Sequence, residues 1–422
     1  MKKVIIVGGG ISGLSVAWYL RNLPVEISLL ERKSVLGGVM QSVRKGAFLW
    51  EQGPEVFKWS RCPELICLIQ ELGLSQDLIF SSEEAKRRYL YVRGALRPLF
   101  STLLPLLPAL AKDLWAKKGS GEEESIYDCI SRRYSRQVAI ELFDPITLGI
   151  YAGDIRKLSM KASFPSLYGW QQDYGSFYKG FFKSKKKDSR LFSLKGGNGS
   201  LIAALQKQIR ATVSTSSEVI AITPYADQVI VATNHRAFSC DHLIIATSSR
   251  EAGRLLHIPL LQEITRASIV SVHLGYDQDL WRKKGFGYLV PTSENDPVLG
   301  ALWNSSIFPQ RTRVTSFTFL LGGIHHPEII GFSEEACISL AIRAAKKHMG
   351  IIKEPVEKQV AFHPHFLPQL EVGHSLRMDR VQKMLPARIS CVGNYWEGVS
   401  VEDCLKRAKN FSSSLTRLCT FC

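Results

Sequence analysis

The sequence lacks the marks of a membrane-spanning or repetitive protein. None of its apolar runs reaches the roughly 18 uninterrupted residues of a transmembrane helix, and no internal repeat is present. The one low-complexity patch, KSKKK at residues 183–187, is predicted to be a solvated loop. These absences leave an ordinary folded protein as the class to interpret.

The cysteine pattern gives little support for a metal-binding or redox role. The chain has 9 cysteines, and its C-x-x-C pair, Cys419 and Cys422, stands in the last four residues. Neither a second pair nor a positioned histidine accompanies it, so no metal site is predicted. This usage fits a reducing compartment and predicts a cytoplasmic protein. Met1–Leu20 resembles a signal peptide, but three glycines interrupt its apolar run, which a buried strand explains better.

Acidic residues are the scarcer charged class. The chain has 54 Lys and Arg against 38 Asp and Glu, a net charge of +16. Such a charge favours an anionic partner, which could be nucleic acid, anionic lipid or a polycarboxylate substrate, although solubility alone would also explain it. No aromatic–basic motif or helix-turn-helix supports nucleic acid, so no nucleic-acid partner is expected.

The beginning of the chain carries a dinucleotide-binding pattern. Lys3–Val7 reads as a buried parallel strand, Ser12–Leu23 as a helix stopped by Pro24, and Val25–Leu30 as a second strand that ends at Glu31. The loop between the first strand and the helix has the sequence Gly8-Gly9-Gly10-Ile11-Ser12-Gly13. Strand, glycine loop, helix, strand and acid in this order favour a Rossmann-type unit over an ordinary glycine turn.

Each glycine of the loop has an expected task. Gly8 permits a tight turn, Gly10 lets the backbone approach a pyrophosphate, and Gly13 lets the helix pack close to the strand. The pyrophosphate would sit at the helix N-terminus, where free N–H groups and the helix dipole favour negative charge. Glu31 can accept hydrogen bonds from the adenosine ribose.

Periodicity and turn residues predict further elements. Arg88–Val92 and Ala95–Leu99 should form a hairpin over Arg93-Gly94. Further helices are predicted at Cys62–Leu74, Leu201–Arg210, Glu334–Met349 and Val401–Leu415. Further strands are predicted at Glu218–Thr223, Gln228–Thr233, His242–Ala246, Ile269–Leu274, Thr315–Leu320 and Ile389–Val392.

A second candidate binding element lies near the C-terminus. The segment Val392–Ser400, VGNYWEGVS, leads from a buried strand into the last helix. Ser400, with Asp403 three residues later, is a helix-start signature. A helix N-terminus at this place would favour negative charge on a bound group.

Several ordered motifs resemble a known family. Glu31-Arg32 with the later Gly37-Gly38 resembles the FAD-containing amine oxidase and porphyrinogen oxidase superfamily, which favours FAD over NAD. Five further segments resemble the oxygen-dependent protoporphyrinogen and coproporphyrinogen III oxidases of haem biosynthesis: residues 52–57 (QGPEVF), 149–160 (GIYAGDIRKLSM), 164–180 (from FPSL to Gly180), 367–374 (LPQLEVGH) and 393–404 (GNYWEGVSVEDC).

The resemblance implies an α/β fold of the flavin amine oxidase type. It combines a Rossmann-type FAD-binding domain with a discontinuous mixed α+β substrate domain and a helical insertion. The expected division is an FAD-binding domain in three parts (1–80, 190–252 and 385–422), a helical and substrate insertion with a possible membrane-facing patch (81–189) and a substrate domain (253–384).

The resemblance also implies the residues that contact non-covalent FAD. They are Gly8, Gly9, Gly10, Ile11, Ser12, Gly13, Glu31, Arg32, Val39, Gly53, Pro54, Glu55, Val56, Val219 (to adenine, through its backbone), Asn394, Val399, Ser400 and Val401. Glu55 stands at a position that varies in the family, and His363-Pro364-His365-Phe366 departs from the family pattern.

The implied reaction is oxidation of a porphyrinogen to the porphyrin. Hydride passes from a meso carbon to flavin N5, a pyrrole N–H proton is lost, and O2 reoxidises the flavin with formation of H2O2, three rounds removing six electrons. Arg97 resembles a carboxylate anchor for the tetrapyrrole, although a surface arginine explains it nearly as well. No general base is assigned, since a structural, hydrogen-bonded role is favoured for His374.

Alternatives stay open on substrate, class and location. Protoporphyrinogen IX and coproporphyrinogen III are both possible substrates, and an amine oxidase, a carotenoid desaturase or an inactive FAD scaffold would share the fold. Leu99–Ala111 is apolar but broken by Pro105 and Pro108, so it packs as core by default. Alternatively, it rests on the inner face of the cytoplasmic membrane as a peripheral patch, with Lys112, Lys117 and Lys118 near lipid phosphates.

Overall fold

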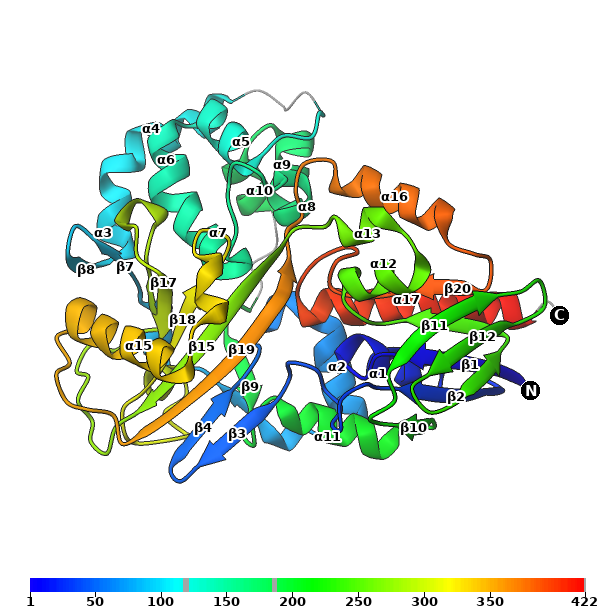
Figure 1. The fold of residues 1–422 in the computed structure, drawn as a ribbon. Helices are drawn as coiled ribbons and strands as arrows, with labels where there is room; N and C mark the ends of the chain where they lie inside the picture. The colour runs from blue at the N-terminus through cyan, green and yellow to red at the C-terminus, as the bar shows by residue number, and fades with distance from the viewer. Residues whose placement is uncertain (117–120, 184–187, 421–422) are drawn as a thin grey trace.

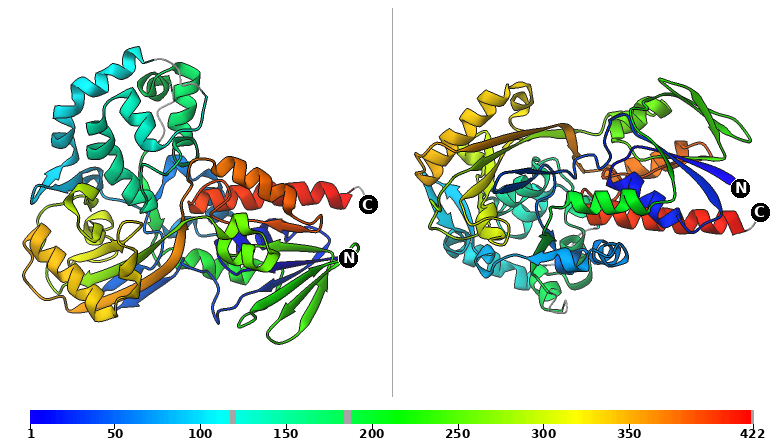
Figure 2. Two further views of the ribbon diagram at one scale, coloured as in Figure 1. Left: turned by 45° about the horizontal axis from the view of Figure 1, so that its top comes forward. Right: turned by 90° about the horizontal axis from the view of Figure 1, so that it is seen from below.

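Figure 1 shows the fold in a computed structural model that describes residues 1–116, 121–183 and 188–420. Residues 117–120, which include Lys117 and Lys118, lie outside the described residues. So do residues 184–187 of the lysine patch and Cys422. The N- and C-terminal ends of the chain lie at the same end of the molecule in all three views (Figures 1 and 2).

A five-stranded parallel sheet forms the base of the nucleotide-binding part. The first strand, β1, is central because its run Val4–Val7 is apolar and fully buried. Val4 of β1 pairs with Ile27 on one side and with His242 on the other. In spatial order the strands are β10 (Thr212–Ser214), β2 (Val25–Leu30), β1 (Lys2–Val7), β14 (His242–Ile245) and β20 (Ile389–Cys391).

Two layers cover this sheet. Helices on one face share an apolar core with the sheet through residues such as Leu14, Leu65 and Leu405; they are α1 (Ile11–Leu20), α2 (Pro63–Glu71), α11 (Gly199–Gln208) and α17 (Val401–Thr420). The other face packs against a small antiparallel sheet and three helices: β11 (Val219–Pro224), β12 (Val229–Thr233), β13 (Ala237–Cys240), α12 (Ser249–Leu256), α13 (Pro259–Gln262) and α16 (His374–Met384).

A seven-stranded mixed sheet forms the second large unit. Helix α15 (Glu334–Met349) packs Cys337, Ala341 and Ala344 against its apolar residues, among them Val272 and Phe319. In spatial order the strands are β19 (Glu357–Pro368), β15 (Arg266–Gly275), β18 (Ser316–Gly322), β17 (Val298–Leu302), β16 (Gly287–Leu289), β7 (Arg88–Val92) and β8 (Ala95–Pro98). Helix α14 (Asn304–Ile307) lies between β17 and β18 in sequence.

A helical insertion stands above this sheet in Figure 1, drawn in cyan to green. Its own core includes Leu106, Ile130 and Phe177. The helices are α3 (Leu99–Leu103), α4 (Leu107–Ala111), α5 (Ile126–Arg133), α6 (Arg136–Val138), α7 (Asp144–Tyr151), α8 (Met160–Ser163), α9 (Pro165–Tyr174) and α10 (Phe177–Lys183), with a π-helical turn at Ala139–Phe143. Within the described residues, no helix combines the length and apolar character needed to cross a bilayer.

Two small sheets connect the large units. One pairs β3 (Ser42–Lys45) with β4 (Phe48–Glu51), and the other joins β5 (Phe57–Lys58), β9 (Leu191–Leu194) and β6 (Leu78–Phe80). They place residues 52–56, the expected Gly-Pro segment, between the nucleotide-binding part and the seven-stranded sheet, because Trp50 of β4 donates to Ser316 of β18 at 2.9 Å.

The predicted elements are present, with shifted ends. The hairpin β7–β8 turns at Arg93 and Gly94, whose φ angles of 52° and 72° are those of a two-residue primed turn. The first helix begins at Ile11 and ends at Leu20, three residues before the predicted end. The second begins at Pro63 and ends at Glu71, three residues before the predicted end, because Gly73, with φ of 77°, ends it in the left-handed conformation.

The expected domain division stays a prediction, and core packing bears on two of its boundaries. Helix α16, within the expected substrate segment 253–384, contributes Met378 and Val381 to the core of the nucleotide-binding sheet. The hairpin β7–β8, within the expected insertion 81–189, belongs to the seven-stranded sheet. By packing, residues 88–98 therefore go with the seven-stranded sheet and residues 374–384 with the nucleotide-binding sheet.

Candidate cofactor and substrate site

The glycine loop has the backbone that a dinucleotide fold requires. Gly8 has φ of 109°, and a Cβ on it would lie 2.8 Å from the carbonyl oxygen of Ala246. A Cβ on Gly13 would lie 1.9 Å from the carbonyl oxygen of Gly8, so only glycine lets α1 approach β1 this closely. At Gly10, by contrast, a Cβ would meet no protein atom within 4 Å. The loop thus offers open space at the position expected to face a pyrophosphate.

Glu31 lies directly against this loop. Its N–H donates to the Ser214 carbonyl at 2.9 Å, which fixes it at the carboxyl end of β2. Its carboxylate accepts from the backbone N–H of Gly9 at 2.7 Å and of Lys33 at 2.8 Å. Arg32 is exposed beside it. The acid predicted to hold a ribose is therefore within reach of the glycine loop.

The chain after β2 folds back onto the loop, as the Glu-Arg and Gly-Gly spacing implies. The Gly37 N–H donates to the Gly9 carbonyl at 2.7 Å. A Cβ on Gly53 would lie 2.4 Å from the Val39 carbonyl oxygen, so the Gly-Pro segment packs directly on this returning loop. The returning loop at residues 37–39 and the Gly-Pro segment packed on it thus lie beside the glycine loop that leads into α1.

The C-terminal motif forms the predicted helix start. The Ser400 Oγ accepts from the Asp403 N–H at 3.1 Å, and the Asp403 carboxylate accepts from the Ser400 N–H at 3.1 Å, a complete capping box at α17. Val401 packs on the core that contains α1, and Val399 packs on both the insertion and the seven-stranded sheet. Asn394 Nδ2 donates to the Phe366 carbonyl of β19 at 3.4 Å. The motif therefore stands where the three units meet.

Val219 lies at the same end of the sheet as Glu31. The Ser217 N–H donates to the Glu31 carbonyl at 2.8 Å, two residues before Val219 begins β11. Val219 is buried, and its carbonyl accepts from Arg254 Nη2 at 3.2 Å. The residues predicted to contact adenine (Val219) and ribose (Glu31) thus lie close together in the structure. Their contacts with the cofactor itself stay predictions.

The predicted substrate anchor lies apart from these residues. Arg97 is exposed on β8, opposite Leu90 of β7. Strand β8 is at one edge of the seven-stranded sheet and β19, whose Phe366 contacts Asn394, is at the other. Arg97 would therefore approach a large substrate from the far edge of this sheet.

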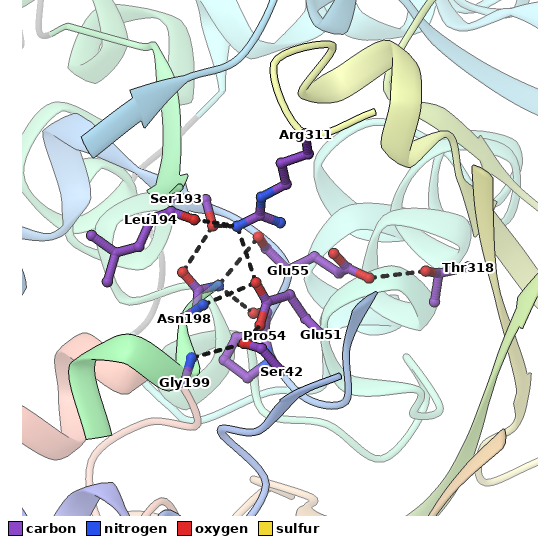
Figure 3. Close-up of polar contacts among 10 residues, drawn as sticks. All are labelled: Ser42, Glu51, Pro54, Glu55, Ser193, Leu194, Asn198, Gly199, Arg311 and Thr318. Atoms are coloured by element: carbon purple, nitrogen blue, oxygen red, sulfur yellow. Dashed lines mark hydrogen bonds and ion pairs between the residues drawn. The ribbon is translucent and has the colours of Figure 1, made fainter. Parts of the chain in front are cut away.

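Sequence reasoning missed a buried polar network that ties the units together (Figure 3). Arg311 Nη2 donates to Glu51 Oε1 at 3.0 Å, Ser193 Oγ at 2.7 Å and the Leu194 carbonyl at 2.7 Å. Both side chains of this ion pair are nearly inaccessible, at 6% for Arg311 and 1% for Glu51. Burial raises the pKa of Glu51, and the charge of Arg311 opposes that rise.

Asn198 extends this network to the Gly-Pro segment. Its N–H donates to Glu51 Oε1 at 2.9 Å, and its Nδ2 donates to the Pro54 carbonyl at 2.7 Å and the Glu55 carbonyl at 3.3 Å. The glycine-rich turn at residues 196–199 was the available signal, since Gly197 has φ of 94° and a Cβ there would lie 2.4 Å from Ser42 Oγ. The turn serves to place the Asn198 amide under the segment.

Glu55 itself is buried and faces the seven-stranded sheet. Thr318 Oγ1 on β18 donates to Glu55 Oε1 at 2.9 Å, as Figure 3 shows, and Thr318 also contacts His273 Nδ1 on β15 at 2.9 Å. Burial, with the nearby Glu51 charge second, raises the pKa of Glu55 to about 7. Burial lowers the pKa of His273 to about 3, so this histidine is neutral.

His374 has the structural role that was favoured for it. Its ring is buried, and its Nε2 bonds the Tyr395 carbonyl at 2.9 Å, which ties α16 to the C-terminal motif. Burial lowers its pKa. Among the described residues, no group of three or more His, Cys, Asp and Glu could hold a metal ion.

Comparison with known proteins defines the class. The family model described as flavin containing amine oxidoreductase matches residues 11–413. The chain belongs to this family, and its fold is the flavin amine oxidase fold. Wild-type putrescine oxidase bound to putrescine shares that fold, with a TM-score of 0.74 at 14% identity over 99% of both chains.

The relatives within this class carry more specific names. Protoporphyrinogen oxidase of Bos taurus is 29% identical over 97% of both proteins, and coproporphyrinogen III oxidase of Bacillus subtilis (strain 168) is 25% identical over 99% of this chain and 98% of its own length. A crystal structure from Exiguobacterium sp. 255-15, provisionally named a protoporphyrinogen oxidase, superposes with a TM-score of 0.89 at 25% identity over 98% of both chains.

The cofactor of the chain is FAD, and its residues fit that group. The open space at Gly10, which a Cβ would fill, adjoins the start of α1, where no side chain caps the helix. Such a terminus presents N–H groups to a pyrophosphate. The second helix start, at α17, is capped by its own Ser400 and Asp403, and its Glu402 accepts from the N–H groups of Glu64 and Leu65 at the start of α2.

Proposed function

We propose that this chain oxidises a porphyrinogen, either protoporphyrinogen IX or coproporphyrinogen III, to the corresponding porphyrin with O2 as acceptor. The observation that carries the proposal is a match over nearly the whole chain to enzymes named for these two substrates. The intact glycine cradle supports it, because it gives the chain a place for the redox cofactor that such an oxidation needs.

The chain's own residues divide the work of holding the cofactor. The loop Gly8–Gly13 and Glu31 would hold the pyrophosphate and ribose, and Val219 would contact the adenine through its backbone. Residues 53–56, Asn394 and Val399–Val401 would hold the ring system, and the bound group would supply the two-electron acceptor for the oxidation. The α17 N-terminus favours negative charge at that end.

Substrate binding uses the region between the ring system and the seven-stranded sheet. Arg97 would bind a propionate group from the sheet edge, where a guanidinium can hold a carboxylate by two parallel hydrogen bonds. Replacing Arg97 with Met should raise KM more than it lowers kcat, because the anchor acts equally before and during reaction. An unchanged KM would remove Arg97 from the substrate site.

The aromatic residues of the C-terminal motif argue against the amine oxidase alternative. Tyr395 and Trp396 lie with ring centroids 6.1 Å apart, but both are buried in the core beneath the nucleotide-binding sheet. Trp396 is further covered by the Arg407 guanidinium at 4.3 Å. Neither ring is thus available as a cage around a substrate amine.

The insertion carries an exposed apolar surface, and we propose that it rests on a membrane. The default core interpretation of Leu99–Ala111 is wrong for its exposed members, since Phe100 is 72% exposed and Leu104 and Leu107 are 50% exposed each. α10, which contacts the turn at residues 112–115, adds Phe181 and Phe182 at 63% and 79%. The membrane-facing residues of this aromatic patch are Phe100, Leu104, Leu107, Trp115, Phe181 and Phe182.

The charge beside the aromatic patch suits anionic lipid. Lys112 precedes Trp115, and Lys179 and Lys183 flank Phe181 and Phe182. Such cations contribute about 1 kcal/mol each near an anionic surface. In flotation with anionic liposomes, we expect the protein to bind at low salt. Absence of binding there would overturn the membrane proposal and leave the enzymatic one intact.

Turnover tests the enzymatic proposal directly. The purified flavoprotein is given protoporphyrinogen IX or coproporphyrinogen III in air, and porphyrin fluorescence and H2O2 are followed together. The expected result is porphyrin formation with three H2O2 per porphyrin, since each round removes two of six electrons. Absence of porphyrin above the rate of spontaneous oxidation with both substrates would overturn the proposed function.

A further inference from the structure

Two buried carboxylates with different surroundings lie at the Gly-Pro segment: Glu51, which ends β4 just before it, and Glu55 within it. Glu51 is engaged by a guanidinium and by two further donors, Ser42 Oγ at 2.5 Å and the Asn198 N–H. Glu55 is engaged by uncharged groups, since it accepts from the Thr318 hydroxyl and also interacts with the Asn304 side chain. Glu51 is therefore held as a fixed charge, whereas Glu55 is free to change its protonation state.

Glu55 is also held in a defined place. The Asn198 side-chain amide donates to the Glu55 carbonyl, and Gly53 packs on the returning loop at Val39. Its side chain extends to β18, between the segment expected to contact the flavin ring and the sheet expected to cover the substrate (Figure 3). The Glu55 carboxylate is thus held between the Gly-Pro segment and β18.

We propose that Glu55 accepts the pyrrole N–H proton that the porphyrinogen loses in each two-electron oxidation. The assignment rests on the proposed function. In the step, the meso C–H bond breaks and its hydrogen and electron pair go to the flavin. The pyrrole N–H bond breaks, its electron pair enters the new conjugated double bond of the substrate, and its proton forms an O–H bond on Glu55. The substrate is oxidised by two electrons and the flavin is reduced by two.

The electrostatics of the site suit a base that works near neutral pH. Burial raises the pKa of Glu55 to about 7, the Glu51 charge raises it further, and the Arg311 charge with the bonds from Thr318 and Asn304 lowers it. On the sheet side, His273 and His363 are neutral because burial lowers the pKa of both rings. A base whose pKa lies near the working pH transfers protons most efficiently.

The hydrogen bond to Thr318 survives the change of protonation state. The Thr318 hydroxyl donates to the carboxylate, and it can accept from the carboxylic acid while it turns its own hydrogen to Asn304 Oδ1, 3.0 Å away, or to His273 Nδ1. Protonation of Glu55 thus leaves none of these buried partners without a bond, so it carries no penalty for an unpaired buried group.

The test measures the reductive half-reaction of the flavoprotein without oxygen. Flavin bleaching by coproporphyrinogen III and by protoporphyrinogen IX is followed by stopped flow between pH 5 and 9. In the wild type the rate should rise with pH around an apparent pKa near 7. Glu55→Gln keeps the size of the side chain but cannot take a proton, so the rate should fall about 10²–10⁴-fold and the pH-dependent rise should disappear.

Three further variants separate a base from a structural residue. Thr318→Val removes a bond that lowers the pKa of Glu55, so the rise should move to higher pH while the rate at its plateau is kept. Glu55→Asp should restore part of the rate. Glu84→Gln, the same substitution at an exposed position, is the matched control and should behave as the wild type. Flavin content and melting temperature are measured for each variant.

A second readout does not depend on turnover. Infrared difference spectra of the holoenzyme, recorded during a pH titration without substrate, should show a protonated-carboxyl band that titrates near pH 7 and is missing in Glu55→Gln. A band titrating below about pH 5 would overturn the assignment, as would an undiminished bleaching rate in Glu55→Gln. A wild type that neither porphyrinogen bleaches would overturn the proposed function, and the assignment with it.

Discussion

The ion pair between Arg311 and Glu51 offers the sharpest test of how the units are held together. Arg311 stands in the loop before β18 and Glu51 ends β4, so the pair joins the seven-stranded sheet to the start of the Gly-Pro segment, which is expected to contact the flavin. Arg311→Met keeps the length and apolar stem of the side chain and removes its charge. The substitution leaves Glu51 buried without a cation, and it also removes the donor to Ser193 and Leu194.

The size of the effect follows from the burial of both partners. Breaking a buried pair by removing one member costs about 3–5 kcal/mol. Glu51 keeps the bonds from Ser42 and Asn198, which places the expected loss at the lower end, about 3 kcal/mol at pH 8. Removing both charges in Arg311→Met/Glu51→Gln should recover most of this loss, since no unpaired charge then stays buried.

The loss should depend on pH in a defined direction. The pKa of Glu51 is already raised by burial from its ordinary 4.5, and losing Arg311 raises it further. A carboxyl with a raised pKa is stabilising as the neutral acid below its unfolded pKa, and that stability is lost as the pH rises through its folded pKa. The deficit of Arg311→Met should therefore shrink between pH 8 and pH 5.

Urea unfolding of the holoenzyme at fixed FAD concentration, followed by circular dichroism, measures these differences. Arg313→Met is the matched control, because Arg313 is exposed on the same loop and its replacement should change the free energy of unfolding by less than about 0.5 kcal/mol. A loss below about 1 kcal/mol in Arg311→Met at pH 8, or an equal loss at pH 5, would refute the reasoning.

Three other outcomes are expected. Gly10→Ala should leave the circular dichroism of the protein unchanged and weaken FAD binding at least about tenfold by flavin titration, because the new Cβ enters space reserved for the pyrophosphate; unchanged affinity would contradict this. Ser400→Ala should cost about 1 kcal/mol in urea unfolding by removing the α17 cap, and an effect within error would mean that the cap contributes nothing. Phe181→Ser/Phe182→Ser should abolish liposome flotation without changing turnover in detergent, so retained flotation would place the membrane contact elsewhere.

Local patterns account for what the sequence predicted well. The glycine loop, Glu31 and the capping box of α17 each depend on residues that are close in the chain, so spacing alone reveals them. The β7–β8 hairpin is similar, because Arg93-Gly94 determines the turn and with it the register.

Contacts between distant residues account for what it did not predict. Glu51 and Arg311 are 260 positions apart, and neither residue stands in a pattern that indicates a partner. The elevated pKa of Glu55 arises from burial by β18 and from its neighbour Glu51, and only the folded arrangement supplies the first of these. The exposure of Phe100 and Leu104 is a similar case, since an apolar run gives no information about which side packs on the insertion core.

The order of strands in the nucleotide-binding sheet has a consequence for synthesis of the chain. β1 and β2 leave the ribosome first, but β20 and the N-terminus of α17 follow about 360 residues later. At roughly 5–20 residues per second, the sheet waits for its last strand for tens of seconds. From the synthesis of β14 until that of β20, about 145 residues later, β14 presents an open edge that can pair with other nascent chains. Retention of the flavin colour should thus report that synthesis has passed β20 and the start of α17, which are expected to form one wall of the cofactor site.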